Sequence, residues 1–339
     1  MKSIAIVILN WNGEKFLKQF LPGVVSNSFA PNFRVDIVIA DNGSTDKSVE
    51  WLHNTFPTQR VIELDKNYGF TGGYNRALKE IEADYFILLN SDIDVPKGWL
   101  GPMVSFMESN PNAAACMPKL INFNKTDEFE YAGAAGGFLD LLGYPFCRGR
   151  ILNVVEKDNG QYNDSQEIFW ATGACMMVRA NEYWNAGGLD TDFFAHMEEI
   201  DLCWRLKRQG YSIWCIPESK VYHVGGGTLA ANNPRKVYYN HRNNLTMLLK
   251  NLSRKSLIPV MLFRLVLDGL SGLGYALTGK PSFTWSVLRA HMHFYKNIIK
   301  TIRKRRAFKN PKISLYPKSI LFQFFVLRRK VYSNLPSPH

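Results

Sequence analysis

Short apolar runs alternate with segments of helical spacing along the first third of the chain. Four apolar runs without strict alternation predict strands buried on both faces, at residues 4–9, 35–40, 61–64 and 85–89. Apolar positions three and four apart predict helices at residues 14–26, 47–56 and 74–82. Strands that alternate with helices of about 10 residues indicate right-handed crossovers. We therefore predict an α/β fold with a mostly parallel central sheet flanked by helices.

The pattern becomes less regular in the second third of the chain. Strands are predicted at residues 113–117, 168–178 and 211–216, one helix begins near residue 96, and others span residues 198–209 and 235–251. Between residues 118 and 160 the periodicity is lost among glycine and aromatic residues. This stretch is predicted to be an irregular insertion.

Residues 257–277 form an apolar segment that is about long enough to span a bilayer. Arg264 and Asp268 lie within it, and a charge in mid-membrane costs several kcal/mol. We therefore predict an amphipathic segment at the membrane interface, followed by basic residues that contact anionic headgroups. The alternative is a helical hairpin that packs on the domain with a solvated basic face.

Composition and charge narrow the class of partner. The 339 residues are 46% hydrophobic and carry a formal net charge of +12, so an anionic partner is expected. Nucleic acid, an acidic membrane surface and phosphorylated substrates all qualify. The most basic runs, residues 300–312 and 328–330, follow the apolar segment, and no nucleic-acid-binding motif is recognised. A nucleic-acid-binding protein is therefore disfavoured.

Cysteine usage and the N-terminal pattern bear on location. The five cysteines are scattered without a C-x-x-C pair, which argues against a disulfide framework or a zinc site and for a reducing compartment. The N-terminal apolar run is too short for a signal peptide and lacks a small-residue cleavage site. A cytoplasmic location is expected.

Polar residues follow the buried strand at residues 85–89. Asn90, Ser91, Asp92 and Asp94 come directly after it, at the edge of a parallel sheet where ligands bind. Carboxylates at this position suit a hard divalent cation and the phosphates that it carries. The alternative is that Asn90 and Asp92 only form a turn and cap the next helix.

Two other loops at the same edge carry candidate binding residues. Asp41 follows the second strand, where its carboxylate would accept a hydrogen bond from N3–H of uracil or thymine, and Trp11 offers a flat face for stacking a base. Taken alone, Asp41 with Asn42 and Gly43 is better interpreted as a turn former. The glycine-rich segment 67–75 leads into a helix, where backbone N–H groups would approach a phosphate.

Three carboxylates begin the helix predicted at residues 198–209. Glu198 and Asp201 share a face, whereas Glu199 points elsewhere, and their crowding raises the proton affinity of at least one of them. A general base needs such an environment, although acids also favour a helix start through the dipole. His223, in the motif at residues 221–228, is a structural residue or, beside an acidic site, a metal ligand.

Together these motifs resemble family 2 glycosyltransferases, in particular the rhamnosyltransferase-like branch that builds bacterial surface polysaccharides. The resemblance covers about residues 2–251. Six segments carry it in one order: ILNWNG (8–13), DNGSTD (41–46), NYGFTGGYN (67–75), LNSD (89–92), GGLD (187–190) and EEIDLCWR (198–205).

The resemblance implies a GT-A fold and an inverting single displacement from a nucleotide-sugar. A glycosyltransferase domain would span residues 1–251, with a nucleotide-binding half at about 1–117 and an acceptor half at about 118–251. Residues 252–339 would form a helical, basic C-terminal region. The donor would be a UDP- or dTDP-sugar, with dTDP-rhamnose as one candidate, and the acceptor a lipid-linked or nascent polysaccharide. The enzyme would lie peripherally on the inner face of the plasma membrane.

The resemblance also assigns roles to individual residues. Glu199 would be the base that deprotonates the acceptor hydroxyl, with Asp201 in reserve. Asp92 and His223 would bind Mg²⁺ or Mn²⁺, with Asp94 in support. The nucleotide-sugar would be bound by Asn10, Trp11, Asp41, Asn67, Gly69, Gly73, Asn75, Ser91 and Arg242.

Two positions depart from the family pattern. Asn90 stands where the first acid of the D-x-D motif is expected, and Glu199 stands where the base is usually Asp. These departures support a second hypothesis, a catalytically weak sugar-nucleotide-binding scaffold of a glycan assembly complex. It predicts nucleotide binding without turnover.

Overall fold

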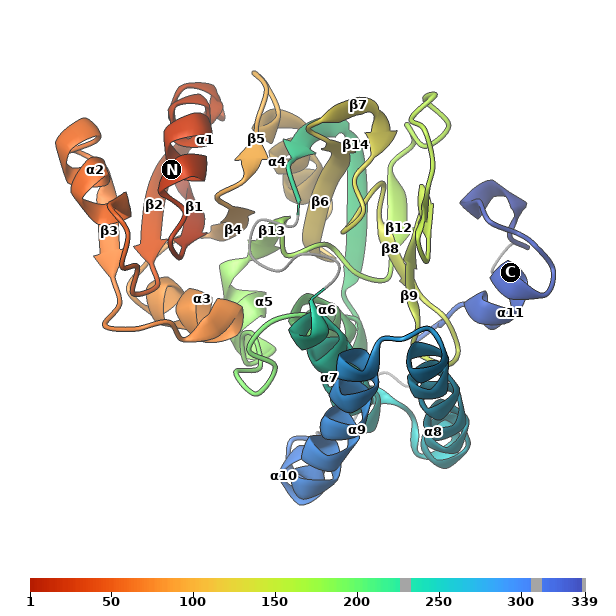
Figure 1. The fold of residues 1–339 in the computed structure, drawn as a ribbon. Coiled ribbons are helices and arrows are strands. Elements are labelled where there is room, and N and C mark those ends of the chain that lie inside the picture. The colour runs from red at the N-terminus through yellow and green to blue at the C-terminus, as the bar shows by residue number, and fades with distance from the viewer. Residues whose placement is uncertain (226–232, 306–312, 337–339) are drawn as a thin grey trace.

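The computed structural model describes residues 1–225, 233–305 and 313–336, and it shows a large twisted sheet with helices around it (Figure 1). The first half contains β1 (Lys2–Asn10), α1 (Glu14–Asn27), β2 (Phe33–Asp41), α2 (Ser48–Thr55), β3 (Arg60–Glu63), α3 (Gly69–Lys79), β4 (Tyr85–Asn90), β5 (Ile93–Asp94) and α4 (Leu100–Ser109). The second half starts with β6 (Ala113–Asn122), β7 (Lys125–Phe129), β8 (Gly137–Leu139), β9 (Pro145–Cys147), β10 (Arg150–Ile151), β11 (Val154–Val155), β12 (Gln166–Ile168) and β13 (Cys175–Arg179). It continues with α5 (Ala180–Asn185), α6 (Glu198–Arg208), β14 (Ser212–His223) and α7 (Pro234–Asn251).

The main sheet has the order β12-β14-β6-β13-β4-β1-β2-β3, with β5 paired to β14 and β7 paired to β6. Strands β1 to β4 pair in parallel, and so do β6 and β14. Because β13 is antiparallel to both β4 and β6, those two strands run in the same direction. The carboxyl ends of β1, β2, β4, β6 and β14 therefore meet at one edge. The predicted mostly parallel sheet flanked by helices is confirmed.

Helix α3 differs from the prediction because it begins at Gly69 rather than at Tyr74. The glycine-rich segment is therefore mostly helical. The glycines allow close packing: a Cβ on Gly73 would lie 2.7 Å from Cδ1 of Leu9, on β1. The approach of α3 to the sheet explains the glycines without a ligand.

The predicted irregular insertion at residues 118–160 is wrong. Strand β6 extends into it, β7 follows, and β8 to β11 form a second sheet of four short strands. Strands of two to five residues are too short to show a period of two. The single strand predicted at 168–178 is also wrong, because residues 169–174 form a connection between β12 and β13.

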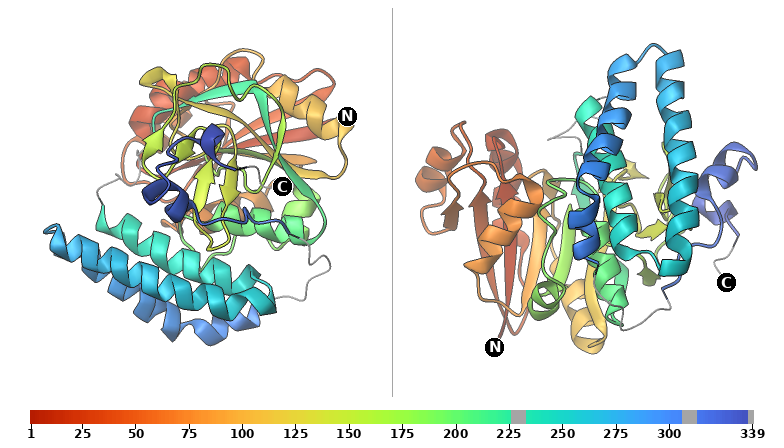
Figure 2. Two further views of the ribbon diagram at one scale, coloured as in Figure 1. Left: turned by 90° about the vertical axis from the view of Figure 1, so that its right-hand side faces the viewer. Right: turned by 90° about the horizontal axis from the view of Figure 1, so that it is seen from below.

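Helices dominate the C-terminal region. They are α8 (Arg254–Leu277), α9 (Pro281–Lys296), α10 (Ile298–Arg303) and α11 (Ile320–Phe325), followed by the 3-10 turn Tyr332–Asn334. Helices α8 and α9 form an antiparallel hairpin, in which Thr284 Oγ1 donates to the carbonyl of Gly272. The hairpin projects beyond the sheet domain (Figure 2). Residues 306–312, part of the basic run, lie outside the described residues.

Contacts cross the boundary that we place at residue 251. The side chain of Asp140, in the second sheet's turn, accepts a hydrogen bond from the backbone N–H of Ile320 at the start of α11. The ring of Tyr332 packs against Phe138 and Phe146. The end of the chain is thus attached to the second sheet, and the division into domains stays a prediction.

Substitution of Gly137 tests the packing between the two sheets. A Cβ on Gly137 would lie 2.0 Å from the Trp170 ring. Overpacking should lower the free energy of unfolding of Gly137→Ala by about 1–3 kcal/mol, measured by urea denaturation. The control is Gly269→Ala, in α8, where nothing lies within 4 Å of the new methyl group. It should be stabilising by about 0.5–1 kcal/mol, and an equal loss in both variants would contradict the packing argument.

Candidate active site

The ends of β1 and β2 are joined by a buried hydrogen-bond network. The Asn10 amide donates to Oδ1 of Asp41 at 2.9 Å, and the backbone N–H of Ser44 donates to Oδ2 of Asp41 at 2.9 Å. Asp41 is 2% exposed, so its carboxylate fixes these two loops and does not face the solvent. Trp11, next to Asn10, is 46% exposed and is free to stack on a base.

The end of β4 reaches the same place. A Cβ on Gly13 would lie 2.4 Å from Oδ1 of Asn10 and 3.4 Å from Oγ of Ser91. Ser91 therefore lies beside Asn10, as the prediction requires of two residues that bind one ligand. Asn10 Oδ1 is buried and has no hydrogen-bond partner among the described residues.

His223 lies between two carboxylates. Its Nε2 is 3.1 Å from Oδ1 of Asp92, and its Nδ1 is 3.2 Å from Oε1 of Glu130. Burial lowers the pKa of His223, but the two carboxylates outweigh it and raise the pKa to about 10. Sequence reasoning missed Glu130, because it lies in the segment that was predicted to be irregular. Residues 226–228 of the motif around His223 are outside the described residues.

Asp92 and His223 fit a divalent metal as a pair once the ion has displaced the proton from His223, because only the neutral imidazole is a ligand. The described residues contain no group of three or more His, Cys, Asp or Glu placed to hold an ion. Mg²⁺, however, is often held by one or two protein ligands together with water and substrate phosphates. A carboxylate on the second nitrogen of a ligating histidine orients the ring, and Glu130 occupies that position. A site with two protein ligands is therefore compatible with the geometry.

Asp94 does not join this pair. It lies opposite Tyr222 in the pairing of β5 with β14, whereas Ile93 lies opposite His223. Because side chains alternate along a strand, Asp94 faces away from His223. Its Oδ1 instead lies 3.8 Å from the position of a Cβ on Gly23, in α1. The prediction of Asp94 as a supporting ligand is wrong for this reason.

Glu198 and Glu199 are neighbouring carboxyl groups at the start of α6. Burial raises the pKa of Glu199 to about 7. Burial and the charge of Glu199 raise the pKa of Glu198 well above its usual value. Glu198 is fully buried, whereas Glu199 retains partial solvent access. Near neutral pH, Glu199 is thus the member of the pair that exchanges a proton, as a general base must.

Asp201 is unsuited to the reserve role. Its Oδ2 accepts from Lys250 and Arg205, both at 2.8 Å, and its Oδ1 accepts from Asn251 at 2.7 Å. It has no exposed surface. Although burial raises its pKa, Lys250 and Arg205 bring the pKa below the usual value. A carboxylate fixed in this way joins α6 to α7 and does not accept a proton from a substrate.

Residues of the 67–75 segment bind the protein's own loops. Asn67 Oδ1 accepts from the backbone N–H of Gly69 at 2.7 Å. Gly69 has φ +72° and packs against the ring of Phe194. Asn75 donates to the carbonyl of Leu189 at 2.6 Å and accepts from its N–H at 3.1 Å. The structure therefore does not place Asn75, Gly69 or Gly73 as a phosphate cradle.

Arg242 also supports a loop. Its Nη2 donates to the carbonyls of Asp192 and Phe193, both at 2.8 Å, and its Nε donates to Oδ1 of Asn243 at 2.8 Å. Asn243 in turn donates to the carbonyls of Ala195 and His196. Arg242 would have to break these bonds to reach a diphosphate, so the predicted contact does not fit this geometry.

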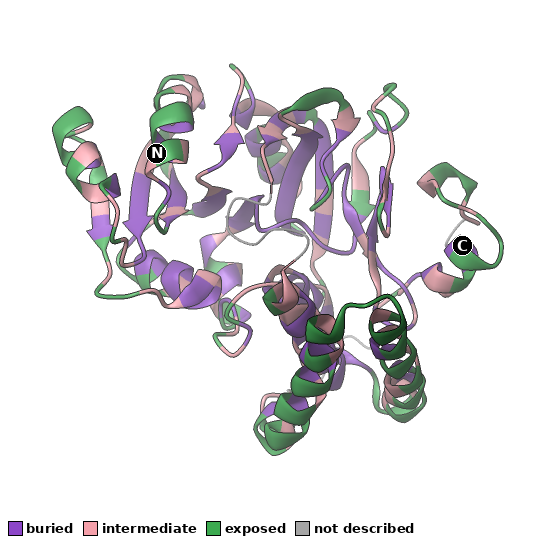
Figure 3. Cartoon of the chain, viewed as in Figure 1, coloured by how far each residue is buried: buried purple, intermediate pink, exposed green. Residues whose placement is uncertain are grey.

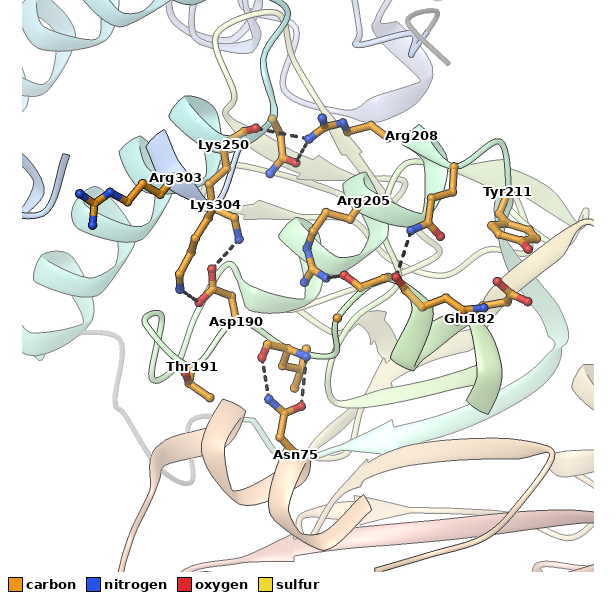
Figure 4. A pocket seen from close by; sticks show the side chains of 16 residues that line it. Asn75, Glu182, Asp190, Thr191, Arg205, Arg208, Tyr211, Lys250, Arg303 and Lys304 are labelled. Carbon is orange, nitrogen blue, oxygen red and sulfur yellow. Dashed lines mark hydrogen bonds and ion pairs between the residues drawn. The ribbon is translucent and has the colours of Figure 1, made fainter. Parts of the chain in front are cut away.

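A pocket of about 910 Å³ lies between α5, α6, α7 and α10 (Figure 4). Asn75 is the one predicted site residue in its lining. Two of its lysines, Lys250 and Lys304, pair with Asp190, which has a pKa below its usual value because these cations outweigh burial. The pocket is therefore lined by a closed ionic network that holds α6 and α7, and it lacks Asp92, Glu199 and His223.

Comparison with known proteins follows this geometry. The sequence model described as "Glycosyl transferase family 2" matches residues 5–185. The chain is 24% identical over 238 residues to N-acetylglucosaminyl-diphospho-decaprenol L-rhamnosyltransferase of Mycobacterium tuberculosis, covering 65% of this chain and 75% of that protein. It is 24% identical over 231 residues to rhamnosyltransferase WbbL of Escherichia coli, covering 65% of this chain and 83% of that protein.

A solved structure supports the fold. GalNAc-T7, crystallised with UDP, GalNAc and Mn²⁺, superposes with a TM-score of 0.58 at 14% identity. The match covers 74% of this chain, and the chain spans about half of that structure's length (48%). The expected GT-A fold is confirmed.

The raised pKa of Glu199 predicts a pH-dependent gain in stability for Glu199→Gln. Since the folded protein holds this proton up to about pH 7, the wild type loses stability as pH rises from 4.5 to 7, and the variant does not. The advantage of the variant should be larger at pH 8 than at pH 5 by at least about 1 kcal/mol, measured by urea denaturation. The exposed Glu80→Gln serves as control. A difference between the variants that does not change with pH would contradict the raised pKa.

Proposed function

The chain belongs to glycosyl transferase family 2 and is a glycosyltransferase, and from this we propose that it inverts the configuration of the sugar that it transfers. The donor is a UDP- or dTDP-sugar, and the acceptor is a lipid-linked or nascent polysaccharide. Two relatives are named as rhamnosyltransferases, which favours dTDP-rhamnose as the donor. The solved structure with UDP and Mn²⁺ favours a uridine or thymidine diphosphate and a divalent ion.

One observation carries the proposal: Glu199, a carboxyl group whose pKa burial raises, lies at the same edge of the sheet as the Asp92–His223 pair. Cβ of Glu199 lies 3.8 Å from the position of a Cβ on Gly173, and the carbonyl of the next residue, Ala174, accepts from the backbone N–H of Asn90 at the end of β4 at 2.9 Å. Glu130 contacts His223 directly. A base and a metal-binding pair on one edge of the sheet suit a direct displacement at a sugar carbon.

Each residue of the site has a separate role in the proposed reaction. Trp11 stacks on the base, while Asn10 and Ser91 line the end of β1 and β4 where the nucleotide lies. Asp92 and His223 would hold Mg²⁺ or Mn²⁺, which supplies positive charge that stabilises the departing diphosphate. Glu199 takes the proton from the acceptor hydroxyl as its oxygen bonds to C1. The bond from C1 to the diphosphate breaks on the opposite face, which inverts the configuration.

Donor hydrolysis in a panel of UDP-, dTDP- and GDP-sugars tests this assignment. We expect release of UDP or dTDP from one donor with Mn²⁺ or Mg²⁺ and none with EDTA. Asp92→Ala should abolish it, and Glu130→Gln should weaken metal affinity by about 10–100-fold because the ring of His223 loses its orientation. Asp94→Ala, two residues further along the chain and facing away from His223, is the matched control and should retain activity.

Other outcomes of this assay discriminate the hypotheses. Equal loss in Asp92→Ala and Asp94→Ala would contradict the assignment of Asp92. Binding of UDP or dTDP without turnover, with acceptor extracts included, would favour the scaffold hypothesis.

The α8–α9 hairpin supports a peripheral position on the membrane. Helix α8 buries the two charges within its apolar stretch and exposes apolar residues (Figure 3): Arg264 and Asp268 are 3% and 1% exposed and pair at 3.0 Å. The outward apolar side chains of α8 to α10 are Ile258, Leu262, Phe263, Val266, Leu270, Leu273, Leu277, Trp285, Leu288, Met292, Tyr295, Ile299 and Ile302. Such a face is stable in contact with an apolar phase.

We propose that this face lies on an anionic bilayer and that α8 does not cross it. By length and composition α8 is the one described helix that could span a membrane. It is, however, attached to the domain, because Arg264 donates to the carbonyl of Leu142 and stacks on the ring of Tyr144. The net charge of +12 complements anionic headgroups. We place the protein on the cytoplasmic face of the membrane, where a lipid-linked acceptor would be reached.

Vesicle flotation tests this surface. The wild type should float with vesicles that contain phosphatidylglycerol, and less with phosphatidylcholine alone, because both apolar and charged contacts contribute. Phe263→Glu combined with Leu270→Glu should abolish flotation without loss of folding. Phe29→Glu, an equally exposed apolar site in the nucleotide-binding half, should float normally. A dimer that the double variant dissociates, with no flotation of the wild type, would show that the face binds a second copy.

A further inference from the structure

Arg150 is a buried cation with few partners. It is 6% exposed, and its Nε has no hydrogen-bond partner. Its Nη2 donates to Sγ of Cys147 at 3.2 Å and its Nη1 to the carbonyl of Leu152 at 3.4 Å. A thiol and one long carbonyl contact compensate a buried guanidinium poorly, and unpaired buried charge is costly. Such an arrangement indicates that an anion completes it.

A second cation lies on the same aromatic ring. The guanidinium carbon of Arg150 is 4.8 Å from the ring centre of Tyr131, and Nζ of Lys236 is 5.7 Å from it. Burial lowers the pKa of Lys236, and Arg150 lowers it further, while Glu130 opposes them. Neither cation forms an ion pair with a described residue. Tyr131 is 49% exposed and Lys236 is partly exposed, so this group of side chains is accessible from solvent on the side of Tyr131 and Lys236.

The nearest carboxylate, Glu130, is already bound elsewhere. Its Oε1 lies 3.2 Å from His223, and its Oε2 accepts from the backbone N–H of Ala132 at 2.6 Å. Its charge raises the pKa of both Arg150 and Lys236, but it forms an ion pair with His223 and with neither of these two cations. His196 adds a further free atom: its Nε2 is buried without a partner, and burial together with Lys236 lowers its pKa to about 4, so it is neutral.

We propose that Arg150 and Lys236 bind a phosphate group of the acceptor. A guanidinium fork and an ammonium group are the side chains that proteins use for phosphate. Both cations lie in the half of the chain that we assign to the acceptor, and Glu130 and His223 separate them from Asp92, where the donor diphosphate would bind.

This inference rests on the proposed function, and one relative gives it a chemical form. That relative is named for an N-acetylglucosaminyl-diphospho-lipid, in which a diphosphate is attached directly to the sugar. An acceptor of this class would place its hydroxyl at Glu199 while its diphosphate, one sugar ring away, reaches Arg150 and Lys236. The pair would then select acceptors that are still linked to a lipid diphosphate.

Calorimetry with geranyl diphosphate and inorganic pyrophosphate tests this site. We expect the wild type to bind both in EDTA, because the site uses cationic side chains and no metal. Lys236→Gln should weaken binding by at least about tenfold, since it removes a charge-assisted hydrogen bond, while Lys236→Arg should largely retain it. Arg235→Gln, an exposed neighbour, is the matched control. UDP binding with Mn²⁺ should be unchanged in Lys236→Gln.

Three results would overturn the proposal. The first is a wild type that binds no diphosphate in EDTA, and the second is binding that Lys236→Gln leaves intact. The third is equal loss of UDP and geranyl diphosphate binding in Lys236→Gln, which would assign the pair to the donor. Because Arg150 is buried, Arg150→Gln is used only if its thermal unfolding matches the wild type. Failure of the wild type to bind UDP with Mn²⁺ would instead count against the proposed function.

Discussion

The buried ionic network around Asp201 determines the geometry of the active site. Asp201 lies on α6, and Lys250 on α7 bridges it to Asp190 at 2.8 and 2.6 Å. Arg205 also donates hydrogen bonds to the carbonyls of Ala186 and Gly188. Removing one partner of a buried ion pair typically costs about 3–5 kcal/mol, so the network strongly resists any shift of α6. The start of α6 is thereby held where it presents the acidic pair.

Because the start of α6 is held rigidly, Glu198 and Glu199 keep their high proton affinity. Two neighbouring carboxyl groups in a buried position repel each other, and a flexible helix end would move them into water. The helix cannot yield because Asp201, in its first turn, is fixed by α7. The first turn of α6 therefore contains both the candidate base, Glu199, and the carboxylate that fixes the helix, Asp201.

The sequence predicted that the candidate site lies at one edge of the sheet, but it could not separate residues that bind a ligand from residues that support the fold. Ordered motifs at strand ends predicted that Asn10, Ser91, Asp92 and His223 would come together, because parallel strands place their carboxyl ends side by side. Asn75 and Arg242 belong to equally distinctive motifs, yet each binds backbone carbonyls of a neighbouring loop. A sequence motif indicates that a position requires a particular residue type. Only the hydrogen-bond partners of that residue in the structure show whether it is available to a ligand or already binds the protein itself.

Long-range contacts account for the other differences. Glu130 reaches His223 from a hairpin with too few residues to show a period. Asp94 is turned away from His223 by the pairing of β5 with β14, which the sequence does not show. The apolar stretch at 257–277 was predicted to be amphipathic on the assumption that its charges face water. The charges face the protein instead, which only the position of Tyr144 and Leu142 reveals.

The inward position of Arg264 and Asp268 in the hairpin affects how the enzyme would reach a substrate in the proposed membrane. Since Arg264 and Asp268 are satisfied within the protein, the apolar face is formed before any lipid is present, and attachment needs no refolding. The proposed attachment would be reversible and would confine the enzyme to the plane in which a lipid-linked acceptor diffuses. Both molecules would then search two dimensions instead of three, and the effective concentration of a scarce acceptor would rise accordingly.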